Sequence, residues 1–279
     1  GGMSEYMNGF IDKSMDLMAD DIQIQPDGTF GGIGTLDESN IMKIRRIPGV
    51  KDSSGVLVVS LDPDSPPGFS GGNMVFGVEP EKQDRIVKLT SGRYMITGDG
   101  YNAVIGSSIA RKFNLNVGDE LQIKNKRTKR SSSPITYARN VTVVGIMEHT
   151  GSMFDDSVQI PLDRAQKFYN MENTVSFIYA TPMPGVDAED LSRRIELNIE
   201  KVKSDSPKKL REIYEGQIAI FSLITVSAAV LAAIIGGLSV MNTMLMSVSE
   251  RTKEFGLLKA LGAERKSIFI MTMGESAII

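Results

Sequence analysis

The chain of 279 residues contains no cysteine and no tryptophan, and its one histidine is His149. Without cysteine neither a disulfide framework nor a thiolate metal site can form, and a single histidine excludes a site built from several imidazoles. We therefore expect no metal-binding residues. A positive excess is also missing, because 31 Lys and Arg residues stand against 34 Asp and Glu residues. Nucleic acid is therefore not an expected partner.

The glycine motifs that cradle nucleotide phosphates are missing as well. No Walker A pattern, G-x-x-x-x-G-K-[ST], occurs, and neither Gly32-Ile-Gly34 nor Gly98-Asp-Gly100 is followed by a third glycine at dinucleotide spacing. We expect no cofactor-binding residues in this chain, which does not itself bind ATP through a P-loop.

One segment matches a catalytic pattern. Gly68-Phe-Ser70-Gly-Gly72 fits G-x-S-x-G, the nucleophile elbow, and His149 follows it in the chain. An elbow requires a strand before the serine, and the three prolines within 62–67 exclude a central strand there. A membrane-anchored hydrolase that uses Ser70 is therefore the weakest of three functional hypotheses, and we expect no catalytic residues.

Charge is absent over a long stretch near the C-terminus. The 34 residues 216–249 carry no charged side chain, and 218–241 are predominantly apolar. At about 1.5 Å of rise per residue, a helix of this length exceeds a hydrocarbon core of about 30 Å. A buried helix of a soluble domain is usually shorter and has a polar stripe. The stretch predicts a transmembrane helix.

The residues before this stretch are typical of a charge-rich, water-soluble domain. Apolar residues at helical spacing over 4–18 predict an amphipathic stalk helix. A strand at 22–25, a helix at 36–47 and a strand at 55–61 predict a β-α-β unit.

A region of short strands and hairpin turns follows. It contains an expected strand at 102–106, a helix at 107–113 and strands at 120–124 and 140–146. We interpret the basic loop 124–130 as a solvated hairpin tip, in preference to a contact with anionic lipid.

After Pro161 the pattern returns to alternating helices and strands. We expect a helix at 162–169, a strand at 175–180, and a long helix that starts with a capping box at Asp187 and whose apolar stripe runs to Val202. Pro207 predicts a kink before the span. Helix-and-strand elements therefore flank a β-rich insertion.

The segment after the span predicts an amphipathic helix. At helical spacing Phe255, Leu258 and Leu261 share an apolar side. Such a helix lies on lipid or docks a partner protein. Its two glycines, Gly256 and Gly262, allow close backbone approach and favour docking.

Residues 249–263, SERTKEFGLLKALGA, resemble the E-R-x-x-E-[IF]-G-x-x-[KR]-A-[LI]-G-A signature of FtsX-like permeases of the MacB type of ABC transporter. Glu264 is a departure from the family's usual small polar residue. The resemblance implies that this segment lies in the cytoplasm, between the second and third transmembrane helices, and contacts an ATPase subunit. The residues it assigns to ATPase coupling are Glu250, Arg251, Glu254, Phe255, Gly256, Leu258, Lys259, Leu261 and Gly262.

The rest of the chain resembles, more weakly, the MacB-like extracytoplasmic core. The resemblance implies an α+β fold with two lobes, an α-β porter lobe and an inserted β-rich sabre lobe, on helical stalks and followed by a transmembrane helix. Outside the membrane, the expected domains are a stalk helix over 1–20 after a missing first transmembrane helix, the porter-like lobe over 21–72 and 161–205, and the sabre-like lobe over 73–160. A stalk over 206–215 leads into the transmembrane helix over 216–248. The coupling segment follows over 249–266, and the truncated start of the next transmembrane helix covers 267–279.

We therefore expect a permease subunit, not itself an enzyme, in the cell membrane of a prokaryote with its large domain outside the cytoplasm. Lys and Arg are equally frequent on the two sides of the span, so this orientation rests on the resemblance. The resemblance implies a partner ABC ATPase that binds ATP and Mg, a second permease copy, the lipid membrane and a partner protein outside the cytoplasm. It also implies mechanotransmission, in which ATP hydrolysis moves the outer domain to export a substrate. The alternative is an FtsX-like signalling protein that controls an extracytoplasmic partner such as a cell-wall hydrolase.

Overall fold

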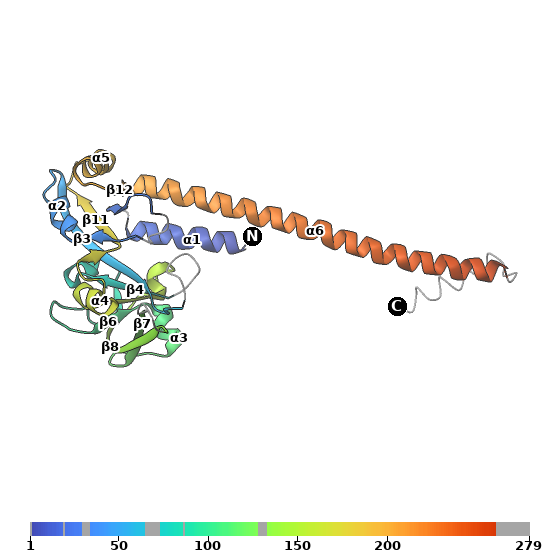
Figure 1. Cartoon of the computed structure of the whole chain (residues 1–279), viewed down its shortest axis with the longest axis horizontal. Helices are drawn as coiled ribbons and strands as arrows, with labels where there is room; N and C mark the ends of the chain where they lie inside the picture. The colour runs from blue at the N-terminus through green and yellow to red at the C-terminus, as the bar shows by residue number, and fades with distance from the viewer. Residues whose placement is uncertain are drawn as a thin grey trace. The chain divides into compact units, whose positions relative to one another are not determined.

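The computed structural model describes residues 2–18, 20–29, 34–64, 73–85, 87–127 and 133–260. The chain divides into two compact units, Gly1–Ile218 and Ala219–Ile279. The first is a mixed domain of helices and strands, and the second contains the larger part of one long helix (Figure 1). The predicted fold class, an α+β domain followed by an apolar helix, is confirmed.

Ten strands form one sheet within the described part of the first unit. Its order is β12 (Val202–Asp205), β1 (Ile22–Pro26), β11 (Phe177–Pro182), β3 (Val50–Ser60), β4 (Met74–Val78), β9 (Ser157–Pro161), β6 (Asn102–Ile105), β8 (Ile135–Met147) and β5 (Leu89–Gly92), and β7 (Glu120–Arg127) pairs with β8. A separate pair is formed by β2 (Leu36–Asp37) and β10 (Thr174–Val175).

Strand β3 belongs to two parts of this sheet. Its residues 50–56 pair with β11 and its residues 57–60 pair with β4, antiparallel in both cases. We refer to the part from β12 to β3 as the base lobe, and to the part from β4 to β5, together with β7, as the inserted lobe. The two lobes share this strand and a hydrophobic core that includes Ile22 of β1 and Val143 of β8.

Helices cover the sheet where their apolar side chains face it. In the base lobe, α2 (Ser39–Arg45) packs on β3 and α5 (Ala188–Asn198) packs on β12. Helix α5 starts at Asp187, whose carboxylate accepts the backbone N–H of Asp190 at 3.2 Å and so satisfies a donor that the first turn leaves free. The remaining elements of the domain are α1 (Gly2–Leu17), α3 (Ser107–Phe113), α4 (Leu162–Tyr169) and the short 3-10 helices η1 (Pro80–Arg85) and η2 (Met153–Asp156).

Two sequence predictions near the end of the domain are wrong. The apolar stripe predicted a helix through Val202, but α5 ends at Asn198, because Lys201 takes a positive φ of 58° and Val202 pairs with Pro26 of β1. Pro207 was expected to kink a helix. Instead it is the first residue of α6 (Pro207–Ala260), a position where its missing N–H costs nothing.

Two further predictions are too coarse. The basic loop expected from residue 124 begins later, because 124–127 continue β7 and pair with 135–138 of β8. The helix expected over 36–47 is shorter, because Leu36 and Asp37 pair with β10 before α2 begins.

Candidate functional site

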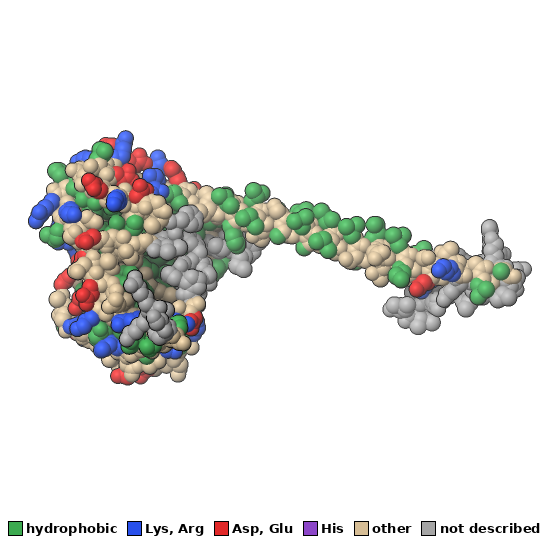
Figure 2. All heavy atoms as spheres, viewed as in Figure 1, with side chains coloured by type: hydrophobic (Ala, Val, Ile, Leu, Met, Phe, Trp, Pro, Cys, Tyr) green, Lys and Arg blue, Asp and Glu red, His purple; other side chains and the backbone are tan. Residues whose placement is uncertain are grey.

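Helix α6 is continuous over its 54 residues. Its most apolar window of 18 residues has a mean hydropathy of 2.7, and none of that window is buried. Figure 2 shows hydrophobic side chains along the helix. By length and composition this helix is able to cross a membrane, as the sequence predicts.

Hydroxyl groups within the apolar stretch are satisfied by the helix itself. Thr225 donates to the carbonyl of Phe221 at 2.9 Å, and Ser239 donates to that of Ile235 at 2.9 Å. Each bond reaches back one turn, so these side chains need no water. The polar residues of the stretch are therefore compatible with a hydrocarbon environment.

The predicted coupling segment continues α6 without a break as far as Ala260. Glu250, Arg251 and Gly256 are exposed, and within the described residues Glu250 and Arg251 form no ion pair. The backbone of Glu254, Phe255, Leu258 and Lys259 is helical. The remaining two coupling residues, Leu261 and Gly262, lie outside the described residues, so the coupling role stays a prediction.

The first turns of α6 are fixed to the base lobe and to α1. The N–H of Lys209 is donated to the Ser206 hydroxyl at 3.3 Å, and the Lys209 ammonium lies 3.1 Å from the buried Asp205 carboxylate at the end of β12. The Arg211 guanidinium reaches two carboxylates of α1, at 3.4 Å from Asp12 and 3.0 Å from Asp16. Helix α6 therefore begins as a direct extension of strand β12.

Helix α1 leads into β1 of the base lobe and also contacts the inserted lobe. The buried Ser14 hydroxyl donates to the carbonyl of Phe10 at 2.7 Å and accepts the backbone N–H of Met153 in η2 at 3.1 Å. At the end of α1, Leu17 and Met18 pack against a second hydrophobic cluster that includes Phe154. Both stalk helices are thus continuous with strands of the base lobe, and α1 in addition holds the inserted lobe.

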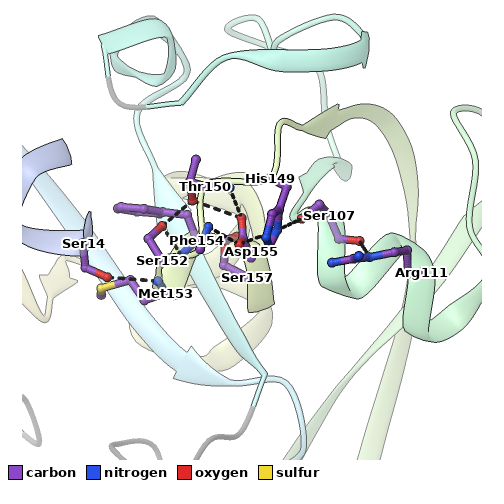
Figure 3. A network of polar contacts seen from close by, with 11 residues as sticks. Ser14, Ser107, Arg111, His149, Thr150, Ser152, Met153, Phe154, Asp155 and Ser157 are labelled. Carbon is purple, nitrogen blue, oxygen red and sulfur yellow. Dashed lines mark hydrogen bonds and ion pairs between the residues drawn. The ribbon is translucent and has the colours of Figure 1, made fainter. Parts of the chain in front are cut away.

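The neighbourhood of His149 contains the residue types of a catalytic triad, but not its geometry (Figure 3). The Ser107 hydroxyl lies 3.1 Å from Nδ1 of His149, and the Asp155 carboxylate lies 2.8 Å from the same nitrogen. A relay requires the carboxylate and the nucleophile to use opposite ring nitrogens. This histidine therefore does not serve as a general base for Ser107.

Asp155 has a structural role in this network. Its buried carboxylate accepts the backbone N–H groups of Thr150 at 2.9 Å and Gly151 at 2.7 Å. These bonds hold the turn that leads into η2, the element that receives Ser14 (Figure 3). Ser70, the serine of the elbow pattern, lies outside the described residues.

A cavity of about 70 Å³ lies between the two lobes. Its walls come from β3 and β11 of the base lobe, from β4, β9, η1 and η2 of the inserted lobe, and from Met18 after α1. One wall residue is Glu79, which accepts the backbone N–H of Gly55 at 3.3 Å across the lobe boundary. Burial raises the pKa of the Glu79 carboxyl above its ordinary value, an effect that the Gly55 N–H and Arg45 partly offset.

Comparison with known proteins covers both units. Residues 1–197 match the family described as the MacB-like periplasmic core domain, and residues 207–279 match the FtsX-like permease C-terminal family. The crystal structure of the periplasmic region of MacB from Actinobacillus actinomycetemcomitans has a TM-score of 0.52 at 14% sequence identity, covering 72% of this chain and 95% of that one. At that identity the likeness shows the fold.

Two relatives extend past the soluble domain. An uncharacterized ABC transporter permease of Methanocaldococcus jannaschii is 26% identical over 304 residues, which cover 100% of this chain and 70% of the relative. The macrolide export ATP-binding/permease protein MacB of Bdellovibrio bacteriovorus is 25% identical over 293 residues, which cover 86% of this chain and 43% of the relative. The chain therefore spans less than half of that MacB protein.

Proposed function

The chain belongs to the MacB-like periplasmic core domain family and is a permease of the MacB and FtsX type of ABC transporter, and on this basis we propose that it works by mechanotransmission. Its large domain is of the periplasmic kind, outside the inner membrane that α6 enters. An ATPase and a membrane are implied partners of such a permease. In our proposal ATP and Mg are bound by the ATPase partner and not by these 279 residues, which contain no Walker A pattern.

The observation that carries this proposal is the continuity of α6. One unbroken helix includes both the apolar stretch and the described part of the coupling segment. At about 1.5 Å per residue, 54 residues extend over about 80 Å. A helix transmits a displacement along its axis because each turn is hydrogen-bonded to the next. A shift imposed at Glu250 would therefore be felt at Arg211.

The displacement would reach the outer domain through the attachments of the two stalk helices, α6 and α1. Helix α6 continues β12 of the base lobe, and α1 holds η2 of the inserted lobe through Ser14. Because both helices join strands of the base lobe, a displacement of α6 relative to α1 would act on the base lobe through both helices and on the inserted lobe through α1 alone. Opening or closing between packed units of this kind is a common rigid-body transition. We propose that ATP binding and hydrolysis change the spacing of the lobes in this way.

The proposed contact with the ATPase is the segment from Glu250 to Gly262. Its charged members, Glu250, Arg251, Glu254 and Lys259, would form the polar contacts. Its apolar members, Phe255, Leu258 and Leu261, would fill a groove, as amphipathic helices do on partner proteins. The glycines Gly256 and Gly262 would permit close backbone approach.

The ATPase contact is tested by a double substitution in the complex reconstituted with its ATPase. Glu254→Lys combined with Gly262→Trp should remove the stimulation of ATP turnover by the permease. Glu200→Lys is the control for the charge change, because it makes the same change at an exposed position of the outer domain. Unchanged turnover in the double variant, at equal amounts of assembled protein, would contradict this contact.

Movement between the lobes is tested separately with spin labels. Because these 279 residues contain no cysteine, labels attach in them only at introduced cysteines. Spin labels at Leu197→Cys in the base lobe and Ile135→Cys in the inserted lobe occupy exposed positions, 85% and 44% accessible. The distance distribution between the labels should change when the ATPase is trapped with nucleotide. An unchanged distribution would rule out movement between the lobes, even if the ATPase contact is correct.

A further inference from the structure

The cavity between the lobes has walls that are mainly apolar. The side chains that provide this surface are Met18, Val56, Phe76, Val78, Met153 and Phe154. The rings of Phe76 and Phe154 lie with centroids 6.1 Å apart at an interplanar angle of 41°. Concave sites of this composition accept the apolar body of a ligand and orient it through a few polar groups.

The polar groups of the cavity are mostly occupied by protein partners. The Asp21 carboxylate accepts the hydroxyl of Thr181 at 2.6 Å. The Asp52 carboxylate forms ion pairs with Lys82 and, at 3.4 Å, with Arg45. These groups are already satisfied and have little reason to recruit a ligand.

Glu79 differs from Asp52 because, within the described residues, it forms no ion pair. It differs from Asp21 because its one hydrogen-bond donor is a backbone N–H, that of Gly55, and not a side chain. Among the described residues the cavity wall holds three carboxylates, Asp21, Asp52 and Glu79, and one cation, Lys82, while Arg45, which is not a wall residue, pairs with Asp52. The described part of the wall is therefore net negative. Arg45 offsets only part of the effect of burial on Glu79 and is itself paired with Asp52. A positively charged ligand in the cavity would offset more of the cost of this partly desolvated carboxylate.

We propose that the cavity between the lobes binds a small lipophilic ammonium ion, with Glu79 as its counter-ion. The net negative charge of the described wall favours a cation, and the methionine and aromatic walls suit its apolar body, because both are polarisable and aromatic faces attract cations. Within the described residues no group of three or more metal-ligating side chains is present. One unpaired carboxylate in an apolar wall favours an organic cation over a metal ion.

Binding at this place is linked to the spacing of the lobes. The base lobe supplies Val56, the inserted lobe supplies Glu79 and Phe154, and the stalk supplies Met18. A ligand that contacts the base lobe, the inserted lobe and the stalk together stabilises the arrangement in which all three fit the ligand. Arrangements with another distance between the lobes become less populated. The ammonium ion therefore favours one position of α1 against the domain.

The proposal is tested with the full chain in lipid nanodiscs and no ATPase. Hexylammonium, 1-hexanol and hexanoate have the same apolar tail and differ in the charge of the head group. Hexylammonium should shift the methyl NMR signals of Met18 and Met153, and leave those of the exposed Met42 and Met183 unchanged. Its dissociation constant should be at least about tenfold lower than that of 1-hexanol, the gain expected from one charge-assisted contact, and hexanoate should bind most weakly.

A matched pair of variants assigns the counter-ion. Glu79→Gln keeps the size of the side chain and an acceptor for Gly55, and should weaken hexylammonium binding about tenfold while leaving 1-hexanol unaffected. Glu81→Gln removes a nearby carboxylate that belongs to η1, which begins after Glu79, and that lies outside the cavity wall, and this variant should change neither.

Three results would overturn the proposal. They are equal binding of hexylammonium and 1-hexanol by the unmodified chain, full hexylammonium affinity in Glu79→Gln, and binding without a shift at Met18 and Met153. The comparison of the three probes needs no variant, so it stands even if a substitution unfolds the chain. Because no ATPase is present, its outcome is separate from that of the mechanotransmission proposal.

Discussion

The hydroxyl of Ser14 accepts the backbone N–H of Met153 at 3.1 Å, joining two residues that lie 139 positions apart in the chain. Ser14 is buried in α1, and Met153 begins η2 of the inserted lobe. The bond is therefore the point at which the first stalk helix holds the lobe that interrupts the base lobe. Its loss would release one of the two attachments that our proposed mechanism requires.

Replacing Ser14 with alanine should destabilise the domain by about 1 kcal/mol, because the part-buried N–H of Met153 loses its acceptor. Denaturant unfolding followed by tyrosine fluorescence measures this loss. Ser133→Ala, at an exposed position, is the control and should stay within about 0.5 kcal/mol of the unmodified chain. Equal stability of the two variants would show that the bond does not hold α1.

Arg211 should contribute little to stability, although it joins α6 to α1. Its side chain is 43% exposed and those of Asp12 and Asp16 are more exposed still, so water and salt screen the pairs. Arg211→Ala should cost less than about 1 kcal/mol. A double-mutant cycle with Asp16→Ala measures the pairwise free energy, which should fall as salt is added. A value of zero at low salt would show that the pair is not formed in solution.

Glu79 should make stability fall as the pH rises. Its pKa is raised in the folded domain above the ordinary 4.5, so the folded state holds the proton more tightly than the unfolded chain does. The resulting stabilisation is complete below pH 4.5 and is lost as the pH passes through the raised pKa. Glu79→Gln has no such proton and should be the more stable form at neutral pH. Unfolding curves of both forms between pH 4 and 7 test this, and parallel pH profiles would contradict it.

Gly106 should tolerate no side chain. A Cβ at this position would lie 2.1 Å from the carbonyl oxygen of Asp155 and 2.3 Å from that of Phe154, and neither backbone group can rotate away. Gly106→Ala should therefore destabilise the domain by about 3 kcal/mol or more. Gly9→Ala is the matched control, because a Cβ on α1 meets nothing within 4 Å and alanine favours helix by about 0.5–1 kcal/mol. A tolerated Gly106→Ala would mean that α3 and η2 pack less closely than described.

The sequence predicts elements well where the signal is local. The helices over 107–113 and 162–169 have the predicted bounds, and each ends at an asparagine with positive φ, Asn114 and Asn170. The prediction fails at Val202, which keeps helical spacing with Leu191 and Ile195. Its pairing with Pro26 decides the outcome, and no local pattern reveals a partner so far along the chain.

The candidate sites also differ in whether their signal is local in the sequence. A contiguous motif is sufficient to predict the coupling residues around Glu254. The contact of Ser14 with Met153 and the cavity around Glu79 are assembled from segments that meet only in the fold. Each of these residues is ordinary in its local sequence, so the structure is needed to find them.

The unbroken course of α6 also fixes a rotational phase. Each residue of an α-helix turns the chain by about 100°, so one residue inserted between Arg211 and Glu250 would rotate the two ends against each other by that angle. The face of α6 that contacts α1 through Arg211 and the face that would contact the ATPase in our proposal, at Glu250 and Arg251, are therefore related by residue count. An insertion of seven residues restores the phase to within about 20° while lengthening the helix by about 10 Å. Angle and length along this helix can thus be varied independently.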